Sequence, residues 1–213
     1  MFDAISNAFF FSELIQKPNI AFEKISQNPQ YFRLAAIIFS SSILISIFHQ
    51  VSTLIYSSHG FDALNIAHQI VTFGGIILSH TIMIAIIFHG GKRAKGSSNI
   101  KQIFSVLSFC LIPTMIGIAL VSTGNLLVSY PESEDGLRPS YAYDFIVSPL
   151  VLMQVIILPF FIWSMALYIK AIRITDNFST LQAVILLIFA LIGTQLVSVL
   201  YSFGTSITLQ LLF

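Results

Sequence analysis

The chain has 213 residues, of which 56% are hydrophobic and only 9% are charged, whereas soluble domains average about 45 to 50% apolar and about 25% charged residues. Together with a mean hydropathy of +0.88, this composition excludes an ordinary soluble domain and predicts an all-α integral membrane protein. The formal net charge of +1 says little by itself, and we expect no nucleic-acid partner.

Residues 1–30 come first and are expected to form an amphipathic segment. Phe2, Ile5, Phe9 and Leu14 lie near one face of a helix that is too short and too polar to cross a bilayer. A second short helix should follow and end at Pro29, because proline disfavours helical geometry in the residue before it. We expect both helices to rest on the inner leaflet.

Five apolar stretches follow, each with the roughly 20 residues that a helix needs to cross the hydrocarbon core. They predict a single membrane domain, a five-span helix bundle over residues 31–213. The last stretch is longer than a crossing requires, so it should tilt, kink at Gly193 or Gly204, or bend along the surface, and we favour a tail beyond Gly204. The spans are predicted at about residues 31–56, 67–89, 103–128, 146–172 and 180–204.

Basic residues gather in the segments on one side of these spans. The two loops on the other side carry only Arg138. Because cytoplasmic loops of membrane proteins carry the excess of Lys and Arg, we predict a cytoplasmic N-terminus and an external C-terminus. The basic side carries Lys17, Lys24, Arg33, Lys92, Arg93, Lys95, Lys101, Lys170 and Arg173.

The most basic of these loops, HGGKRAKGSSNIKQ at 89–102, has the glycine spacing of a phosphate-binding loop. That motif also requires Lys and then Ser or Thr after the second glycine and a strand before the first, whereas Gly96 is followed by Ser97 and Ser98. We therefore interpret the loop as a flexible cytoplasmic turn. Each base near an anionic leaflet contributes on the order of 1 kcal/mol, which makes four residues candidate ligands of lipid headgroups: Lys92, Arg93, Lys95 and Lys101.

Polar side chains deep in the spans are His80, Gln154 and Gln195. An unsatisfied polar group in lipid is unfavourable, and these three lie in different spans at compatible depths. We hypothesise an interhelical hydrogen-bond cluster, with simple packing support as the alternative.

Prolines and glycines should shape the bundle. Prolines in spans three and four would kink the helices and free carbonyls that neighbours must satisfy; they are Pro113, Pro149 and Pro159. Small residues permit close helix contact, within one chain or between chains, and the candidates are Gly74, Gly75, Gly117 and Gly193.

No pattern in the chain is typical of an enzyme. It offers no GxSxG, no intramembrane aspartate pair and no zinc motif, and the histidines lack ligand spacing such as HxxxH. We therefore expect no catalysis, no metal and no cofactor.

Three segments carry a family pattern: KPNIAFEKISQNP at 17–29, GKRAKGSSNIKQIFSVLSFCLIP at 91–113 and WSMALYIKAIRITDNFSTLQAV at 163–184. They resemble the Yip domain family, membrane proteins named for interaction with Ypt/Rab GTPases. Ser108 and Phe109 stand where the family usually has glycine and tyrosine. The other matching positions are Pro18, Phe22, Pro29, Pro113, Trp163, Ser179, Thr180 and Ala183.

The resemblance implies five spans and a cytoplasmic N-terminus. Eukaryotic members work in vesicle traffic with small GTPases and have a long acidic N-terminal region, which this sequence lacks. The resemblance is thus to the prokaryotic-type members, and it implies a cell (inner) membrane location without a small GTPase partner.

Taken together, these features favour a non-catalytic multi-pass protein. We expect a scaffold or accessory subunit that organises other membrane proteins or lipids, with the bilayer and anionic headgroups as partners. The alternative is a permease for a small solute, in which the kinked spans and the deep polar residues line a path.

Overall fold

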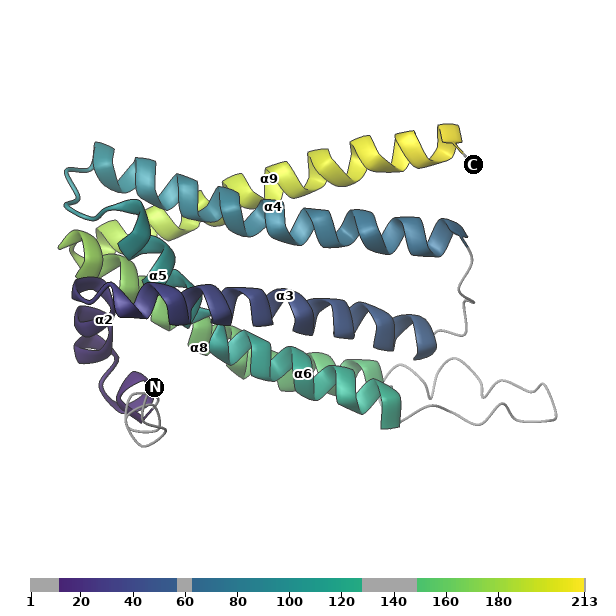
Figure 1. Cartoon of the computed structure of the whole chain (residues 1–213), viewed down its shortest axis with the longest axis horizontal. Coiled ribbons are helices and arrows are strands. Elements are labelled where there is room, and N and C mark those ends of the chain that lie inside the picture. Colours follow the sequence, from purple (N-terminus) through teal and green to yellow (C-terminus); the bar gives the residue numbers. More distant parts are fainter. Residues whose placement is uncertain (1–11, 57–62, 128–148, 213) are drawn as a thin grey trace.

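The computed structural model describes residues 12–56, 63–127 and 149–212. Within these ranges the chain forms helices and short turns, with no strand. Five stretches are long and apolar enough to cross a membrane, which confirms the predicted all-α, five-span architecture (Figure 1). The helices are α2 (Pro18–Gln27), α3 (Gln30–Tyr56), α4 (Ala63–Arg93), α5 (Ile100–Cys110), α6 (Ile112–Leu127), α8 (Pro149–Asp176) and α9 (Thr180–Leu212).

The third span is broken into α5 and α6 next to Pro113. Proline has no N–H to continue the helical ladder. At this break the carbonyl of Cys110 accepts a hydrogen bond from the Ser164 hydroxyl of α8 at 2.8 Å. Ser164 is fully buried and also lies 2.7 Å from the Thr114 hydroxyl. A side chain from a neighbouring helix thus occupies a carbonyl at the break.

The other two prolines of the prediction lie in α8. Pro149 is the first residue of this helix, a position that suits proline because the first N–H of a helix has no intrahelical partner. Residues 128–148 before it lie outside the described part, so the predicted kink at Pro149 stays a prediction. Pro159 lies inside α8.

Helices α4 and α9 pack mainly on each other, whereas α3 and α8 both pack on α6. Two of the glycines on α4 and one on α9 make room for side chains of the partner helix: a Cβ on Gly75 would lie 3.3 Å from the Tyr201 ring, and one on Gly193 would lie 2.6 Å from Ile86 Cδ1. On α6, a Cβ on Gly117 would lie 3.1 Å from both Ile157 Cγ1 and Phe160 Cβ of α8. The predicted small-residue contacts are therefore made within one chain, at Gly74, Gly75, Gly117 and Gly193.

Helix α2 packs on α5 and α8 at one end of the bundle. Its apolar face, Ala21, Phe22 and Ile25, is buried and belongs to the main hydrophobic core. The predicted second short helix is present, but protein covers its apolar face, whereas the sequence predicts that the helix rests on the inner leaflet. Ile15 and Ile20 remain exposed at this end, whereas residues 1–11 lie outside the described part.

Helix α9 continues through both of its glycines in the membrane region. It is helical from Thr180 to Leu212. The helix does not end at Gly204, and the predicted tail beyond Gly204 is part of the same helix as far as Leu212. Nothing lies within 4 Å of a Cβ built at Gly204, and the position is exposed.

Candidate functional site

One end of the bundle carries all the described Lys and Arg residues, and we call it the basic end. It is formed by α2, the start of α3, the α4–α5 loop and the α8–α9 turn (Figure 1). The described carboxylates at this end are Glu13, Glu23 and Asp176, and Glu13 is paired with Lys24 at 2.7 Å. All nine cations are exposed: Lys17, Lys24, Arg33, Lys92, Arg93, Lys95, Lys101, Lys170 and Arg173.

The α4–α5 loop is ordered by capping at both ends. Lys95 has a positive φ of 66°, and Gly96 N donates to Gly91 O at 2.8 Å, which closes the C-terminus of α4 in a Schellman motif. The next helix begins with a capping box, in which Asn99 and Gln102 exchange side-chain to backbone hydrogen bonds at 2.9 Å. The sequence interpretation of this loop as a flexible turn missed these caps.

Gln102 also connects the loop to the N-terminal part of the protein. Its Nε2 donates to the carbonyl of Ser26 near the end of α2 at 3.0 Å. The basic loop, α5 and α2 are therefore joined by one side chain.

A buried carboxylate lies against this loop. Asp176, the last residue of α8, is 3% exposed and accepts hydrogen bonds from Ser98 N at 3.2 Å and Ser98 Oγ at 2.5 Å. A Cβ on Gly91 would lie 2.8 Å from Asp176 Oδ2, and one on Gly96 would collide with the same carboxylate. The glycines that resemble a phosphate loop therefore make room for an acid of the chain itself.

We call Gly91, Gly96, Ser98 and Asp176 the loop clamp. Asp176 Oδ2 has no hydrogen-bond partner in the described structure, and a buried polar atom without a partner is unfavourable. This contact is not among the sequence predictions. Its available signal was an acid at the end of one span and a glycine-rich loop at the same side of the membrane.

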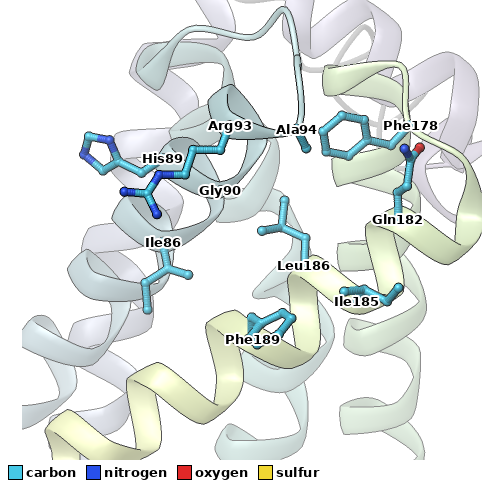
Figure 2. A pocket seen from close by; sticks show the side chains of 10 residues that line it. All are labelled: Ile86, His89, Gly90, Arg93, Ala94, Phe178, Gln182, Ile185, Leu186 and Phe189. Carbon is cyan, nitrogen blue, oxygen red and sulfur yellow. The ribbon is translucent and has the colours of Figure 1, made fainter.

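A groove lies between α4 and α9 beside the clamp, and we call it the α4–α9 groove. Its volume is about 620 Å³. Figure 2 shows Arg93 and His89 on α4 at one side, with Phe178 and Gln182 across from them. Its lining residues are Ile86, His89, Gly90, Arg93, Ala94, Phe178, Gln182, Ile185, Leu186 and Phe189.

A second groove, of about 380 Å³, lies on another face of α4. Its α4 residues are Thr81, Ile84 and Ala85, none of which lines the α4–α9 groove. Lys101 of α5 lies at its edge, and Phe32, Phe39, Ile100 and Phe104 complete the wall.

The four predicted headgroup ligands are thus distributed around the end of α4. Arg93 lines the α4–α9 groove and Lys101 lines the second groove. Lys92 Nζ lies 5.9 Å from the centre of the Phe88 ring, and Lys95 occupies the left-handed turn. All four are exposed, and their contact with headgroups stays a prediction.

The predicted polar cluster is not assembled by its described members. His80 Nδ1 bonds to the Ile76 carbonyl of its own helix at 2.9 Å, and its ring packs on Phe39. Gln195 is exposed, and no hydrogen bond joins it to His80 in the described structure. The side chain of Gln154 lies outside the described residues.

Other polar side chains connect the spans instead. His49 Nδ1 lies 3.1 Å from Ser122 Oγ between α3 and α6, and Ser79 Oγ lies 2.7 Å from Ser198 Oγ between α4 and α9. Small hydroxyls were not singled out from the sequence because serine can also bond its own helix. Ser79 does both, since it donates to Gly75 O at 2.7 Å.

The chain was compared with protein families, curated proteins and solved structures. The Yip1 domain model matches residues 12–202, and no curated protein or solved structure gives a significant match. Several positions that carried the resemblance are fully buried packing residues of the described core, among them Phe22, Phe109, Pro113 and Ala183. Because the match extends from before α2 to within α9, the chain belongs to the Yip1 domain family.

Proposed function

We propose that this protein is a non-catalytic scaffold or accessory subunit of a cell membrane, which holds lipids and membrane partners at its basic end. The observation that carries the proposal is the basic end itself. Nine exposed cations gather there, while one of its three described carboxylates is buried in the loop clamp and another is paired with Lys24.

Electrostatics supports this function. Each Lys or Arg close to an anionic leaflet contributes about 1 kcal/mol to membrane attraction, and the effect decays within a Debye length. The caps and the clamp order the last turn of α4, which carries Lys92 and Arg93, and the turn that follows it, which carries Lys95. Such a surface favours anionic headgroups or an acidic segment of a neighbouring membrane protein.

The same charges support the proposed orientation. With the basic end in the cytoplasm, Arg93 and Lys101 would lie at the inner leaflet, as the positive-inside rule requires. The end of α9 lies at the opposite end of the bundle (Figure 1) and would face the outside.

A permease for a small solute is the second candidate. The break in the third span favours it, because discontinuous helices near buried polar groups form binding sites in many transporters. Here the groups at the break are Ser164, Thr114 and the Cys110 carbonyl.

Purification from the native membrane in mild detergent would separate the two candidates. A scaffold should retain membrane proteins in fixed stoichiometry, and replacing Lys92, Arg93 and Lys95 by Gln should release them or the associated anionic lipid. Replacing Lys17 and Lys170 by Gln removes charge from the same end but not from the ordered loop region, and it should release them less. A protein that is isolated alone and moves a solute in liposomes would contradict the scaffold and favour the permease.

A further inference from the structure

We infer that the α4–α9 groove binds one anionic phospholipid, with an acyl chain along the groove and the phosphate at Arg93. This rests on the proposed function and specifies one lipid site within it. General attraction to a leaflet needs only exposed cations, whereas this site combines a cation with an apolar cavity.

Polarity changes along the groove in the way that such a lipid requires. Arg93 and His89 lie one helical turn apart on α4 and are both exposed, and Gln182 lies across from them (Figure 2). Farther from the loop the wall of the groove is apolar and includes Ile86 and Leu186. A phosphate can thus meet polar groups while its chain meets hydrocarbon.

The groove is open toward the bilayer. Ile185 is 45% exposed and Phe189 is 65% exposed on the α9 side. Its volume of about 620 Å³ falls within the roughly 300 to 1,000 Å³ of small-molecule sites. A lipid of the surrounding leaflet can therefore enter sideways without leaving the membrane.

Two close helix contacts fix the floor of the groove. A Cβ on Gly90 would lie 2.5 Å from Leu186 Cδ1, and one on Gly193 would lie 2.6 Å from Ile86 Cδ1. The absent side chains let α4 and α9 approach each other, so the cavity lies beside a tight contact and is not a loose gap between helices.

Charge favours a lipid over a second copy of the chain. No carboxylate lines the groove, and the nearby Asp176 is hydrogen-bonded to Ser98. Arg93 forms no ion pair with the described carboxylates. A second basic end at the same membrane depth would bring like charges together, which repel, whereas an anionic headgroup supplies the missing counter-charge.

The test uses the full chain in vesicles and fluorescence quenching by brominated lipids. Trp163 is the single tryptophan, so a Trp163→Phe background accepts one reporter at a time. Phe189→Trp reports on the groove. Phe203→Trp is the matched control, because Phe203 is on the same helix and 67% exposed, close to the 65% of Phe189, but does not line the groove.

We expect brominated phosphatidylglycerol to quench the Phe189→Trp reporter at a severalfold lower mole fraction than brominated phosphatidylcholine. The Phe203→Trp reporter should show no preference. Arg93→Gln should reduce the preference roughly fivefold, the factor that corresponds to one leaflet cation. Lys95→Gln removes the same charge from the loop but does not line the groove, so it should leave most of the preference intact.

Native mass spectrometry of the otherwise unaltered chain gives a second measurement. One retained phosphatidylglycerol, lost with Arg93→Gln, is the expected result. Equal quenching by both lipids at Phe189→Trp, an unchanged preference in Arg93→Gln, or quenching that falls as protein concentration rises because a second copy fills the groove would each overturn the inference. Partner retention in the purification experiment would still stand in those cases, so the two proposals fail separately.

Discussion

The loop clamp predicts that Gly91→Ala lowers the free energy of unfolding when Asp176 is present and raises it when Asp176 is replaced by Ala. Gly91 lies in the last turns of α4, and a Cβ there would lie 2.8 Å from Asp176 Oδ2 and 3.3 Å from Asp176 Cγ. No other residue contributes to these close contacts. Overpacking of this kind costs about 1 to 3 kcal/mol, whereas replacing a helical Gly by Ala gains about 1 kcal/mol.

Gly91→Ala should therefore lower the free energy of unfolding by up to about 2 kcal/mol in the natural chain, from the difference of these two terms. Asp176→Ala removes the carboxylate, and in that background Gly91→Ala should raise the free energy of unfolding by up to about 1 kcal/mol. The coupling between the two sites is then about 1 to 3 kcal/mol, the usual range for residues in contact.

Unfolding by SDS in mixed micelles, followed by Trp163 fluorescence, measures all four chains of this cycle. Gly204→Ala is the control, because no atom lies within 4 Å of a Cβ at that helical position, and its effect should be the same in both backgrounds. If Gly91→Ala had the same effect with and without Asp176, the carboxylate would not lie against the loop and the clamp would be refuted.

Three further outcomes are expected. Ser164→Ala should lower the free energy of unfolding in the same titration by about 1 to 3 kcal/mol, because a buried carbonyl at the helix break loses its donor; an unchanged value would mean that the break is satisfied in another way. Gly117→Ala should cost about 1 to 3 kcal/mol by overpacking α6 against α8, and a gain in stability would contradict the contact. In a Cys110→Ala background, an impermeant thiol reagent should label Ser133→Cys, which lies outside the described residues, but not Ser97→Cys in intact cells; the reverse pattern would invert the proposed orientation.

The fold was largely predictable because its determinants are local in the sequence. A span is recognised by the length of its apolar run, and the break in the third span follows from Pro113. The acceptor and donor at that break were not predictable in the same way. Ser164 is 54 residues away from Cys110 along the chain, and nothing in a serine within an apolar run indicates which helix it will face.

The cations of the basic end were predicted from the sequence, but the contacts that hold its loop in place were not. The cations of the α4–α5 loop were identified because their charge alone suffices for the positive-inside argument. The role of Gly91 and Gly96 depends on Asp176. This residue is the last of α8 and lies beside the loop only because the folded chain brings the end of α8 there. Spacing within the loop therefore suggested a phosphate site and could not reveal the acid that occupies its place.

The same limit applies to the amphipathic helix α2. Periodicity identifies an apolar face but does not say whether protein or lipid covers it, and Phe22 is fully buried in the core.

The contacts that stabilise the basic end also bear on the proposed function. Helices α4 and α9 pack mainly on each other, and the α4–α5 loop and the α8–α9 turn connect this pair to the remaining helices. The loop clamp joins those two connections through Asp176 and Ser98. Arg93 of α4 and Phe178 of the turn lie on either side of the groove (Figure 2), so we expect the clamp to help to set the distance between its two walls. A chain that held its cations on an unattached loop would still attract an anionic leaflet, but it would have no fixed groove in which to select one lipid.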